Sequence, residues 1–457
     1  MKEELQGIRR RWGQRLLSTG KMAASATRLA ARGLFGAKGP QDGILGEKLA
    51  KEMEQMKGMA MKVGQILSYF DGILPEDTHK ALQSLQRGVQ PVSFDKMKAL
   101  LEESLGGSVE ELFESFDTEP IAAASIGQVY RARYKGMDVA VKIQYPGVWE
   151  TIQSDFSFLN KMSRLASLAT AVDGPAIVKD LQERFGEECD YRLEAMHQEA
   201  FAKAFAAHPD IHIPRVIAER SSERVLTSEW CEGRDFYSFA EEASPERLQE
   251  VSLLLMQFAY TSLYGLGTLN ADPHPGNYLF PDDGPIVFLD FGCVRRFSPE
   301  FIENERRLAR VIVEDRREDF REALLATGLV SNADKFDFDF HWKMVCHQYA
   351  PYRSDDFLFT KDYIKEGMEF NQPNTPNLRR LAIPPEWIWL QRLQWGLHAV
   401  LVRMGAKGNF RKILLEALDA PLKRLELPSL EVVQNTGSDV GEEPGKKSEA
   451  EDIKTAA

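Results

Sequence analysis

Two aspartates and one asparagine lie in a segment rich in proline and glycine, residues 269–292, which reads LNADPHPGNYLFPDDGPIVFLDFG. This composition disfavours a helix, so Asp272, Asn277 and Asp290 are expected on turns, with the apolar run 286–289 as a buried strand before Asp290. Magnesium prefers oxygen ligands and leaves coordination positions for a substrate's phosphates. A further carboxylate beside the phosphate can position or deprotonate the acceptor. The segment therefore predicts phosphoryl transfer from a magnesium nucleotide.

The order of these residues resembles the protein-kinase signature, in which Asp-x-x-x-x-Asn is followed by a strand and Asp-Phe-Gly. Under this resemblance Asp272 is the catalytic aspartate, and Asn277 and Asp290 bind Mg²⁺. Upstream, VAVK ends a hairpin strand at Lys142, where a kinase lysine holds the α- and β-phosphates of ATP. Capping of turns would also explain Asp and Asn in such loops. The shared order of several elements favours the catalytic interpretation.

The loop before Lys142 departs from the kinase pattern. AAASIGQVY, residues 122–130, aligns with the glycine-rich nucleotide loop but keeps only its last glycine. The positions expected to contact the nucleotide are Ala122, Ala124, Ser125, Gly127 and Val129. Alanine methyl groups prevent the closest approach of backbone to phosphate, so the nucleotide is expected to bind in a different pose. An Ala-Pro-Glu segment does not follow the Asp-Phe-Gly, and ordinary peptide phosphorylation is therefore not expected.

Several motifs together resemble the UbiB-like, AarF-domain atypical kinases, a family linked to isoprenoid-quinone biosynthesis. They occur in the family's order and are KVGQ (62–65), AAASIGQVYRA (122–132), VAVKIQYPGV (139–148), ECDYRLEA (188–195), NADPHPGN (270–277) and LDFG (289–292). This order makes the match specific. The resemblance implies an α+β, two-lobed protein-kinase-like fold. Its N-terminal lobe is small and β-rich, its C-terminal lobe is helical, and an N-terminal helical extension carries the Lys-x-Gly-Gln motif.

The same resemblance implies partners for the nucleotide. Lys142 is expected to pair with Glu194 on the long helix of the N-terminal lobe. The strand RVLTSEWCEG is expected to form the hinge, with Glu229 and Cys231 beside the adenine. Asn270 stands where protein kinases have the histidine of His-Arg-Asp, which leaves Asp272 without an expected cationic neighbour.

The resemblance implies that two further pairs of residues obstruct the nucleotide site. Lys62 and Gln65 lie three residues apart on one helical face and are expected to reach into the nucleotide site and exclude peptide substrates. Glu188 and Asp190 form the family's Glu-x-Asp motif. A helix surface is mostly polar, so solvated faces are the alternative explanation for both pairs.

The chain is expected to divide into five parts, because its composition and periodicity change along it. These are a basic segment suited to a membrane interface (1–48), the helical Lys-x-Gly-Gln extension (49–118), the N-terminal lobe (119–232), the C-terminal lobe (233–430) and a disordered tail (431–457). Within them, GQVYRARY and VAVKIQY predict a hairpin that turns at Gly136, and Ser298 and Pro299 predict the start of a helix.

Bulk composition limits the partners. The net charge of −12 argues against nucleic acid, and no apolar run reaches the 18 or so residues of a membrane span. The four cysteines have no Cys-x-x-Cys pair, which is typical of reduced thiols rather than a disulfide framework or zinc site. We expect a cytoplasmic protein that is peripheral at an inner membrane, or alternatively a protein of an organellar matrix.

We therefore expect an atypical kinase or ATPase that uses ATP and Mg²⁺ and supports ubiquinone-type biosynthesis or lipid homeostasis at a membrane surface. Its expected contacts are a nucleotide, a lipid-like quinone precursor and enzymes of quinone biosynthesis. Two alternatives remain open. One is a pseudokinase scaffold that binds nucleotide without turnover. The other is a small-molecule phosphotransferase, which shares Asp-x-x-x-x-Asn but does not explain the Lys-x-Gly-Gln motif.

Overall fold

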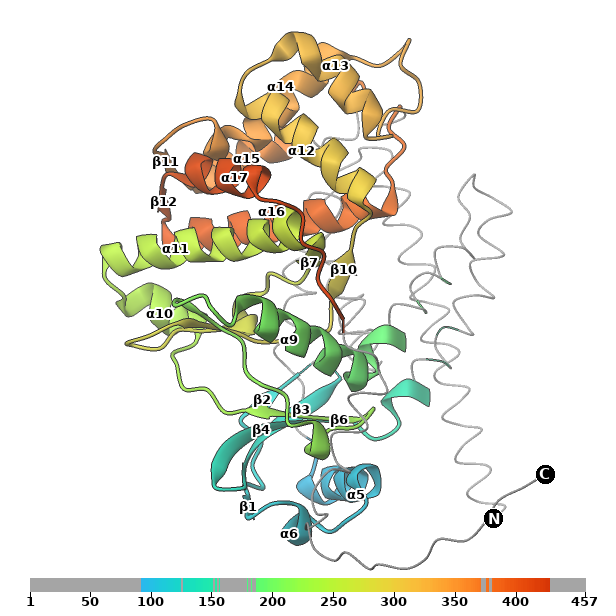
Figure 1. Cartoon of the computed structure of the whole chain (residues 1–457), viewed down its shortest axis with the longest axis vertical. Coiled ribbons are helices and arrows are strands. Elements are labelled where there is room, and N and C mark those ends of the chain that lie inside the picture. The colour runs from blue at the N-terminus through green and yellow to red at the C-terminus, as the bar shows by residue number, and fades with distance from the viewer. Residues whose placement is uncertain are drawn as a thin grey trace, which may run out of the picture.

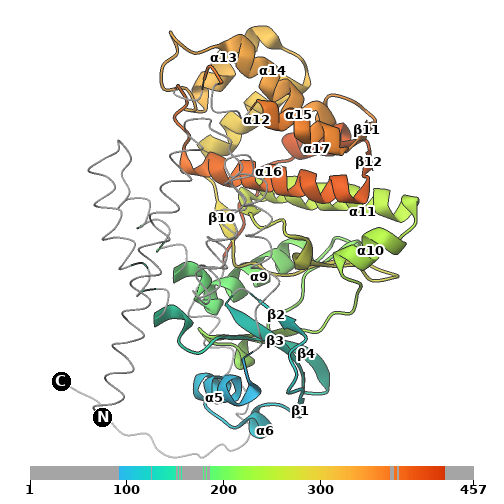
Figure 2. The same ribbon diagram turned by 180° about the vertical axis from the view of Figure 1, so that it is seen from behind.

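The computed structural model describes residues 92–124, 126–150, 186–370, 375–377 and 380–427, with the single positions 153, 156, 179 and 182. The expected basic segment, most of the expected helical extension with Lys62 and Gln65, Ser125, and the expected tail lie outside these residues. The described chain has two lobes (Figures 1 and 2). One is a sheet with flanking helices and the other is largely helical, which confirms the predicted α+β architecture.

The N-terminal lobe is built on a five-stranded antiparallel sheet of order β1-β3-β4-β6, with β2 paired to β3. Its strands are β1 (Ser115–Phe116), β2 (Ala122–Ala123), β3 (Gly127–Tyr134), β4 (Met137–Gln144) and β6 (Val225–Glu229). The β3–β4 turn places Lys135 at φ 49° and Gly136 at φ 74°. Two successive positive φ angles match the twist of a two-residue hairpin, so the predicted hairpin is confirmed.

Two short helices, α5 (Phe94–Leu105) and α6 (Val109–Leu112), cover one face of this sheet. Met97 and Leu101 of α5 are fully buried in one cluster with Val139 and Val141 of β4. Because α5, α6 and β1 share the core of the sheet, the lobe includes residues before 119. The expected boundary at that position is therefore too late by at least one strand and two helices.

Helix α9 (Tyr191–Phe205) lies between the sheet and the helical lobe in both views (Figures 1 and 2). The Asp190 side chain caps it by accepting a hydrogen bond from the Arg192 amide. Further along, the Phe201 ring lies 5.0 Å from Phe291 and 5.9 Å from Phe258, centroid to centroid. These tilted aromatic contacts connect the N-terminal lobe's helix to the core of the C-terminal lobe.

The first part of the C-terminal lobe supplies the loops of the site. Its elements are α10 (Phe236–Glu242), α11 (Pro245–Tyr260), the π-helical turn η2 (Thr261–Gly265), β7 (Thr268–Asn270), the 3₁₀ turn η3 (Pro275–Asn277), β8 (Tyr278–Leu279), β9 (Ile286–Phe288) and β10 (Val294–Arg296). Strand β9 pairs antiparallel with β8 and parallel with β5 (Ile211–His212). The predicted buried strand before Asp290 is thus β9.

In the N-terminal lobe, the 3₁₀ turn η1 (Ala218–Arg220) precedes β6.

The remaining elements are mostly helices, as expected. They are α12 (Pro299–Val313), α13 (Arg317–Ala326), α14 (Phe338–Gln348), the 3₁₀ turn η4 (Ala350–Tyr352), β11 (Phe357–Leu358), α15 (Lys361–Glu369), α16 (Pro385–Met404), β12 (Lys407–Gly408) and α17 (Phe410–Asp419). Helix α12 begins at Pro299 behind its Ser298 cap, as predicted. Helix α16 packs along α11 in the lobe core. Within the described residues, no helix has the length and apolar character needed to cross a bilayer.

Candidate nucleotide and metal site

Three charged side chains from three elements meet between the lobes. The Lys142 ammonium of β4 lies 2.7 Å and 2.9 Å from the two carboxylate oxygens of Glu194 on α9, so the expected pair is present. It also lies 3.5 Å from Oδ2 of Asp290, which follows β9. Burial alone lowers the pKa of Lys142, but the Asp290 and Glu194 carboxylates outweigh it and raise the pKa above its ordinary value. The lysine therefore stays charged.

The residues next to the Lys142 side chain are closely packed. The Lys142 Nζ lies 5.0 Å from the centre of the buried Tyr191 ring, a distance typical of a cation–π contact. A Cβ on Gly127 would lie 2.3 Å from the Ile143 carbonyl oxygen and 2.9 Å from the Tyr191 hydroxyl. Gly127 is therefore required by the approach of β3 to β4 and α9. Its position was expected to serve nucleotide binding, and the structure adds this packing role.

The alanine-rich loop closes as a narrow hairpin. Ala122 pairs with Val129 across β2 and β3, and the Ala124 amide donates a 2.8 Å hydrogen bond to the Gly127 carbonyl. That amide is thus used within the loop itself. Val129 pairs with Lys142 in the β3–β4 register, which puts both side chains on one face of the sheet. This face is turned toward Glu194 and Asp290.

The catalytic-loop aspartate has a cationic partner, contrary to expectation. The Arg392 guanidinium of α16 donates a 2.8 Å hydrogen bond to Oδ1 of Asp272, and both side chains are mostly buried. The Asn277 side-chain nitrogen donates to the Asp272 carbonyl at 3.0 Å and to its Oδ2 at 3.3 Å. The motif around position 270 has no cationic residue beside Asp272. The cation is instead Arg392 of α16, which lies 120 residues later in the sequence. This contact holds Asp272 in one orientation.

Asn270 stands at the histidine position of the kinase motif. It links the loop that carries Asp272 to the loop that carries Asp290. Its side-chain nitrogen donates a 3.0 Å hydrogen bond to the backbone carbonyl of Asp290. Asp290 has φ 52°, an uncommon conformation for a residue other than glycine, and its Oδ1 accepts a 3.0 Å hydrogen bond from the Gly292 amide. Non-glycine residues in this region cluster at functional sites, where the surrounding contacts hold them.

The donor set fits magnesium. Because the Asn277 nitrogen is directed to Asp272, its amide oxygen is turned away from that residue and can coordinate a cation. Asp290 adds a carboxylate that is about one third exposed. An amide oxygen and a carboxylate on short loops suit a cation that keeps the remaining positions for water and phosphate.

The hinge residues are arranged differently from expectation. Glu229 pairs with Val139 in the β4–β6 register, whereas Lys142 pairs with Leu226. Alternation along a strand therefore directs the Glu229 side chain to the sheet face opposite Lys142, whereas Glu229 was expected on the nucleotide side, beside the adenine. Burial, with a smaller contribution from Glu229, raises the pKa of the Cys231 thiol to about 12. The thiol is thus protonated at neutral pH.

The Glu-x-Asp motif lies at the start of α9. Besides capping that helix, Asp190 accepts two hydrogen bonds from the Arg192 guanidinium, at 2.9 Å and 2.8 Å. Glu188 is half-buried and lies in the helical segment 186–188, just before the turn that leads into α9. Lys62 and Gln65, which are expected to reach into the nucleotide site, lie outside the described residues, so that expectation stays a prediction.

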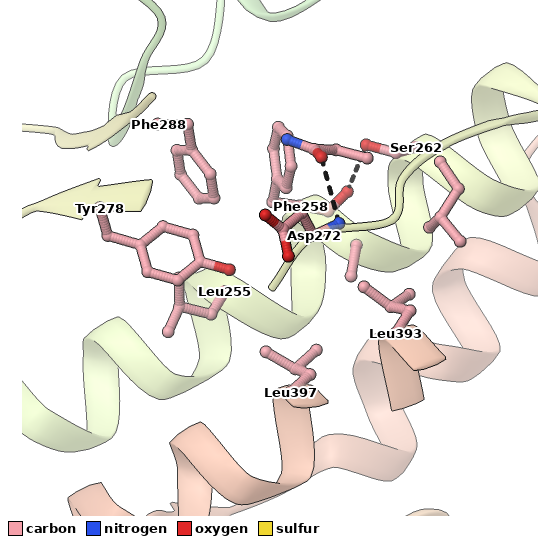
Figure 3. A pocket seen from close by; sticks show the side chains of 11 residues that line it. Leu255, Phe258, Ser262, Asp272, Tyr278, Phe288, Leu393 and Leu397 are labelled. Atoms are coloured by element: carbon pink, nitrogen blue, oxygen red, sulfur yellow. Dashed lines mark hydrogen bonds between the residues drawn. The ribbon is translucent and has the colours of Figure 1, made fainter. Parts of the chain in front are cut away.

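A small pocket lies against Asp272 (Figure 3). It is lined by side chains of α11 and α16, including Leu255, Phe258, Leu393 and Leu397. Its cavity of about 20 Å³ fits one or two water molecules. An isoprenoid chain does not fit there, so a lipid-like acceptor would have to approach Asp272 from another side.

Comparisons with known proteins agree with this geometry. Residues 84–324, more than half of the chain, match the family model described as the ABC1 atypical kinase-like domain. The chain belongs to the ABC1 atypical kinase-like family. The fold is accordingly protein-kinase-like, and the resemblance inferred from the motifs is confirmed.

Similar proteins include members from eukaryotes. The mitochondrial atypical kinase COQ8 of Saccharomyces cerevisiae is 28% identical over 381 residues, which are 81% of this chain and 75% of that protein. The chloroplastic protein ACTIVITY OF BC1 COMPLEX KINASE 3 of Arabidopsis thaliana is 35% identical over 246 residues. Those residues are 52% of this chain but only 34% of the Arabidopsis protein, so the chain spans about a third of that relative.

A solved structure is also similar. It is the complex of Rv3197 with erythromycin from Mycobacterium tuberculosis, with a TM-score of 0.63 and 28% sequence identity. The similarity covers 88% of this chain and 98% of that one.

Two residues of the ABC1 kinase site were missed by sequence reasoning. Arg392 gives no local signal, because its contact with Asp272 spans 120 residues and depends on how α16 packs. Asn270 had a signal, since it occupies a known motif position, but its role as a link to Asp290 appears only in three dimensions.

Proposed function

We propose that this ABC1-family protein is a Mg-ATP-dependent kinase or ATPase that supports isoprenoid-quinone biosynthesis at a membrane surface. The observation that carries the proposal is Lys142 held between Glu194 and Asp290, with Asp272 and Asn277 on the adjoining loop. These side chains come from β4, α9 and two loops of the other lobe. Packing alone would not require a lysine that stays charged in a buried position, because burying a charge is costly. The meeting of these side chains therefore points to a functional role.

Each side chain has a task in that reaction. The Lys142 ammonium binds phosphate oxygens, and Glu194 fixes its position. Asn277 and Asp290 would hold the magnesium ion, which neutralises charge on the transferred phosphoryl group. Asp272 has both carboxylate oxygens engaged by Arg392 and Asn277, so it orients the acceptor hydroxyl or water more readily than it removes a proton.

The quinone link and the location rest on relatives and on the N-terminal sequence. The similarity to the atypical kinase COQ8, named as mitochondrial, extends over most of the chain. The basic segment 1–48, with arginines interleaved among leucines and a tryptophan, suits an anionic membrane surface in an organellar matrix or at a bacterial inner membrane. The acceptor is then water, a quinone precursor or an enzyme complex that makes quinones.

The test is Mg-dependent ATP turnover by the full-length protein, with and without anionic liposomes. Asp290→Asn keeps the shape of the side chain but removes its charge, and turnover should fall by about 100-fold or more because magnesium loses a carboxylate ligand. The control is Asp283→Asn, an exposed loop position seven residues earlier, which should turn over like the wild type. Full turnover by Asp290→Asn would remove the metal assignment.

A cellular experiment tests the quinone link separately. Deletion of the gene should lower isoprenoid quinone levels, and the wild-type gene but not Asp290→Asn should restore them. Single-turnover assays with ATP distinguish the pseudokinase alternative, in which nucleotide binds but no phosphate is released.

A further inference from the structure

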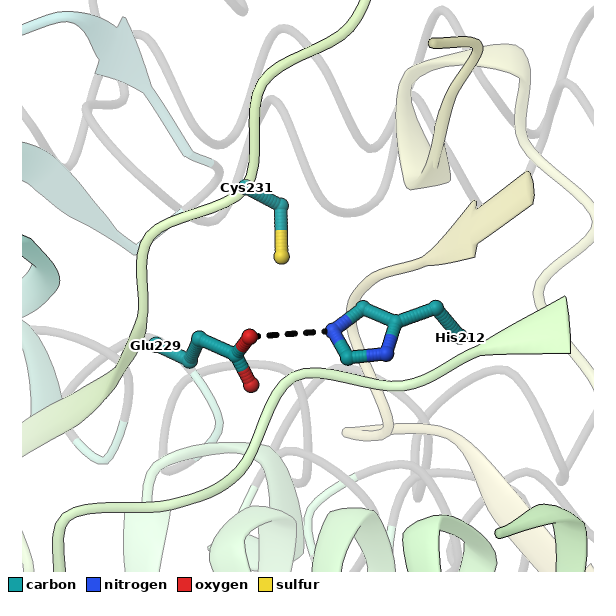
Figure 4. Close-up of side chains that lie close together, drawn as sticks. All are labelled: His212, Glu229 and Cys231. Carbon is teal, nitrogen blue, oxygen red and sulfur yellow. Dashed lines mark ion pairs between the residues drawn. The ribbon is translucent and has the colours of Figure 1, made fainter. Parts of the chain in front are cut away.

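A second group of possible metal ligands lies at the hinge, apart from Asn277 and Asp290. The Nε2 of His212, a carboxylate oxygen of Glu229 and the Sγ of Cys231 all lie within 4.8 Å of one another. The His212 Nε2 is 3.3 Å from Oε1 of Glu229. Figure 4 shows the three side chains directed toward one another, His212 from β5 and both Glu229 and Cys231 from the end of β6 and the segment after it. We propose that they bind a thiophilic divalent cation of the Zn²⁺ class.

The backbone holds these three ligands in place. His212 is in β5, where it pairs with Val287 of β9. Glu229 ends β6, and its amide donates a 2.8 Å hydrogen bond to the Arg215 carbonyl while its Oε2 accepts a 3.2 Å hydrogen bond from the Arg215 amide. Cys231 follows two residues later. His212 and Glu229 are thus each held on a strand that pairs with another strand, so these two ligands need little reorganisation to receive an ion.

The donor set selects the metal. The Cys231 thiol would release its proton to water as the ion binds. The resulting donor set of one imidazole nitrogen, one carboxylate oxygen and one thiolate suits Zn²⁺, which is usually four-coordinate with nitrogen, sulfur and oxygen ligands. Three protein ligands leave one position for water. Mg²⁺ requires oxygen ligands and disfavours sulfur, so the hinge cluster differs in kind from the proposed magnesium site. The chain therefore offers two cation sites of different chemistry.

The position of the cluster suggests what a bound ion would do. The Glu229 side chain lies on the sheet face opposite Lys142, so the ion would bind behind the hinge rather than among the phosphates. It would join the hinge to β5, and β5 pairs with β9, the strand that leads to Asp290. Bound metal would thus fix the hinge relative to the strand that carries the magnesium ligand.

A simple ion pair is the rival explanation for two of the three residues. The His212 side chain is 33% exposed and the Glu229 side chain 40% exposed, and ion pairs with this exposure form without any metal. In that case the Cys231 thiol takes no part in the interaction. The contribution of its sulfur to metal binding therefore decides between the two explanations.

The experiment is a titration of the full-length, metal-free protein with Co²⁺, followed by Zn²⁺. The wild type should bind one equivalent of Co²⁺ with a thiolate-to-cobalt charge-transfer absorption in the near ultraviolet, and Zn²⁺ should displace it. Cys231→Ser should abolish this absorption. His212→Gln should weaken Zn²⁺ binding by roughly tenfold or more, because a ligand is lost.

The matched control is Cys346→Ser, which removes a partly buried cysteine of α14 and should leave the absorption unchanged. Thermal unfolding of each variant checks that it folds, and Zn²⁺ should raise the unfolding midpoint of the wild type but not of Cys231→Ser. A wild type without the thiolate absorption, or an absorption that persists in Cys231→Ser, would overturn the proposal. Neither readout uses ATP, so failure here is distinct from failure of the proposed Mg-ATP function.

Discussion

At the scale of single residues, the Asp272–Arg392 contact distinguishes this site from the motif that predicted it. The protein-kinase motif provides a cation next to its aspartate in sequence, whereas here the guanidinium comes from α16 and is mostly buried. A buried carboxylate that loses its charged partner keeps an unfavourable desolvation energy, and it also loses its fixed orientation. Arg392 is therefore expected to act as a positioning residue for Asp272.

Arg392→Met keeps the aliphatic length of the side chain and removes the charge. A hydrogen bond to a charged group contributes about 1.5–3 kcal/mol, so kcat for ATP turnover should fall roughly 10- to 100-fold. The KM for Mg-ATP should change little, because the guanidinium holds Asp272, which is proposed to orient the acceptor, whereas Lys142 is proposed to bind the phosphates of ATP. Steady-state kinetics measure this split.

Arg403→Met is the control for that substitution, since Arg403 is exposed on the same helix and should leave kcat unchanged. Arg392→Lys should recover part of the lost activity, because a lysine restores the charge without the planar fork. Wild-type kcat in Arg392→Met would show that Asp272 is positioned by other contacts.

At the scale of elements, α16 must approach the catalytic loop closely for Arg392 to reach Asp272. Gly396 lies four residues after Arg392 and so on the same helical face. A Cβ at Gly396 would lie 2.5 Å from Cγ of Pro273 in the loop. Pro273 is a rigid neighbour, so the glycine is required for the helix and the loop to pack at this distance.

Gly396→Ala is therefore expected to push α16 away from the loop. The clash should lower the free energy of unfolding by about 1–3 kcal/mol, although alanine is the better helix former. ATP turnover should fall as well, because the Arg392–Asp272 contact lengthens. Chemical denaturation and steady-state kinetics measure the two effects.

The matched substitution is Gly265→Ala, where the nearest atom to an added Cβ is 3.7 Å away, an ordinary contact. It should leave both the stability and the turnover close to the wild type. Equal effects of the two substitutions would contradict a specific role for the α16 approach.

At the scale of the whole molecule, the helical lobe buries ionisable groups that the site does not use. The Glu305 side chain of α12 is almost fully buried and accepts a 3.0 Å hydrogen bond from the Tyr349 hydroxyl. Burial raises the pKa of Glu305 to about 7, partly offset by that hydrogen bond. The folded state then binds more protons than the unfolded state between about pH 4.5 and 7.

The stability of the protein should consequently depend on pH through Glu305. Its neutral form suits the core, so the Glu305 contribution to the free energy of unfolding falls as pH rises from about 4.5 to 7 and stays low above that. Over this pH range the free energy of unfolding should fall by about 3 kcal/mol through Glu305. The substitution Glu305→Gln should remove this dependence on pH. The mutant should be more stable than the wild type at pH 8 and similar at pH 4.5, as measured by chemical denaturation.

Glu303→Gln, two residues earlier on the exposed face of α12, is the comparison and should unfold like the wild type at both pH values. If Glu305→Gln is no more stable than the wild type at pH 8, the buried carboxylate is not charged there.

Features that depend on short stretches of chain could be predicted from the sequence. The β3–β4 hairpin, the cap of α12, the buried strand before Asp290 and the motif order around Lys142, Asp272 and Asp290 all follow from residues close together in sequence. Turn chemistry, capping and strand periodicity act over a few residues, so they can be recognised without the fold. They were enough to indicate the family and most of the site.

Contacts between residues far apart in the chain became known only from the packing of the folded protein. Arg392 reaches Asp272 across 120 positions, and His212 meets Glu229 and Cys231 although the cysteine spacing gave no sign of a metal cluster. The side-chain direction of Glu229 required the β4–β6 register, and the start of the N-terminal lobe required the packing of α5 on the sheet. Such contacts depend on how whole elements pack and pair, and no local pattern in the chain encodes them.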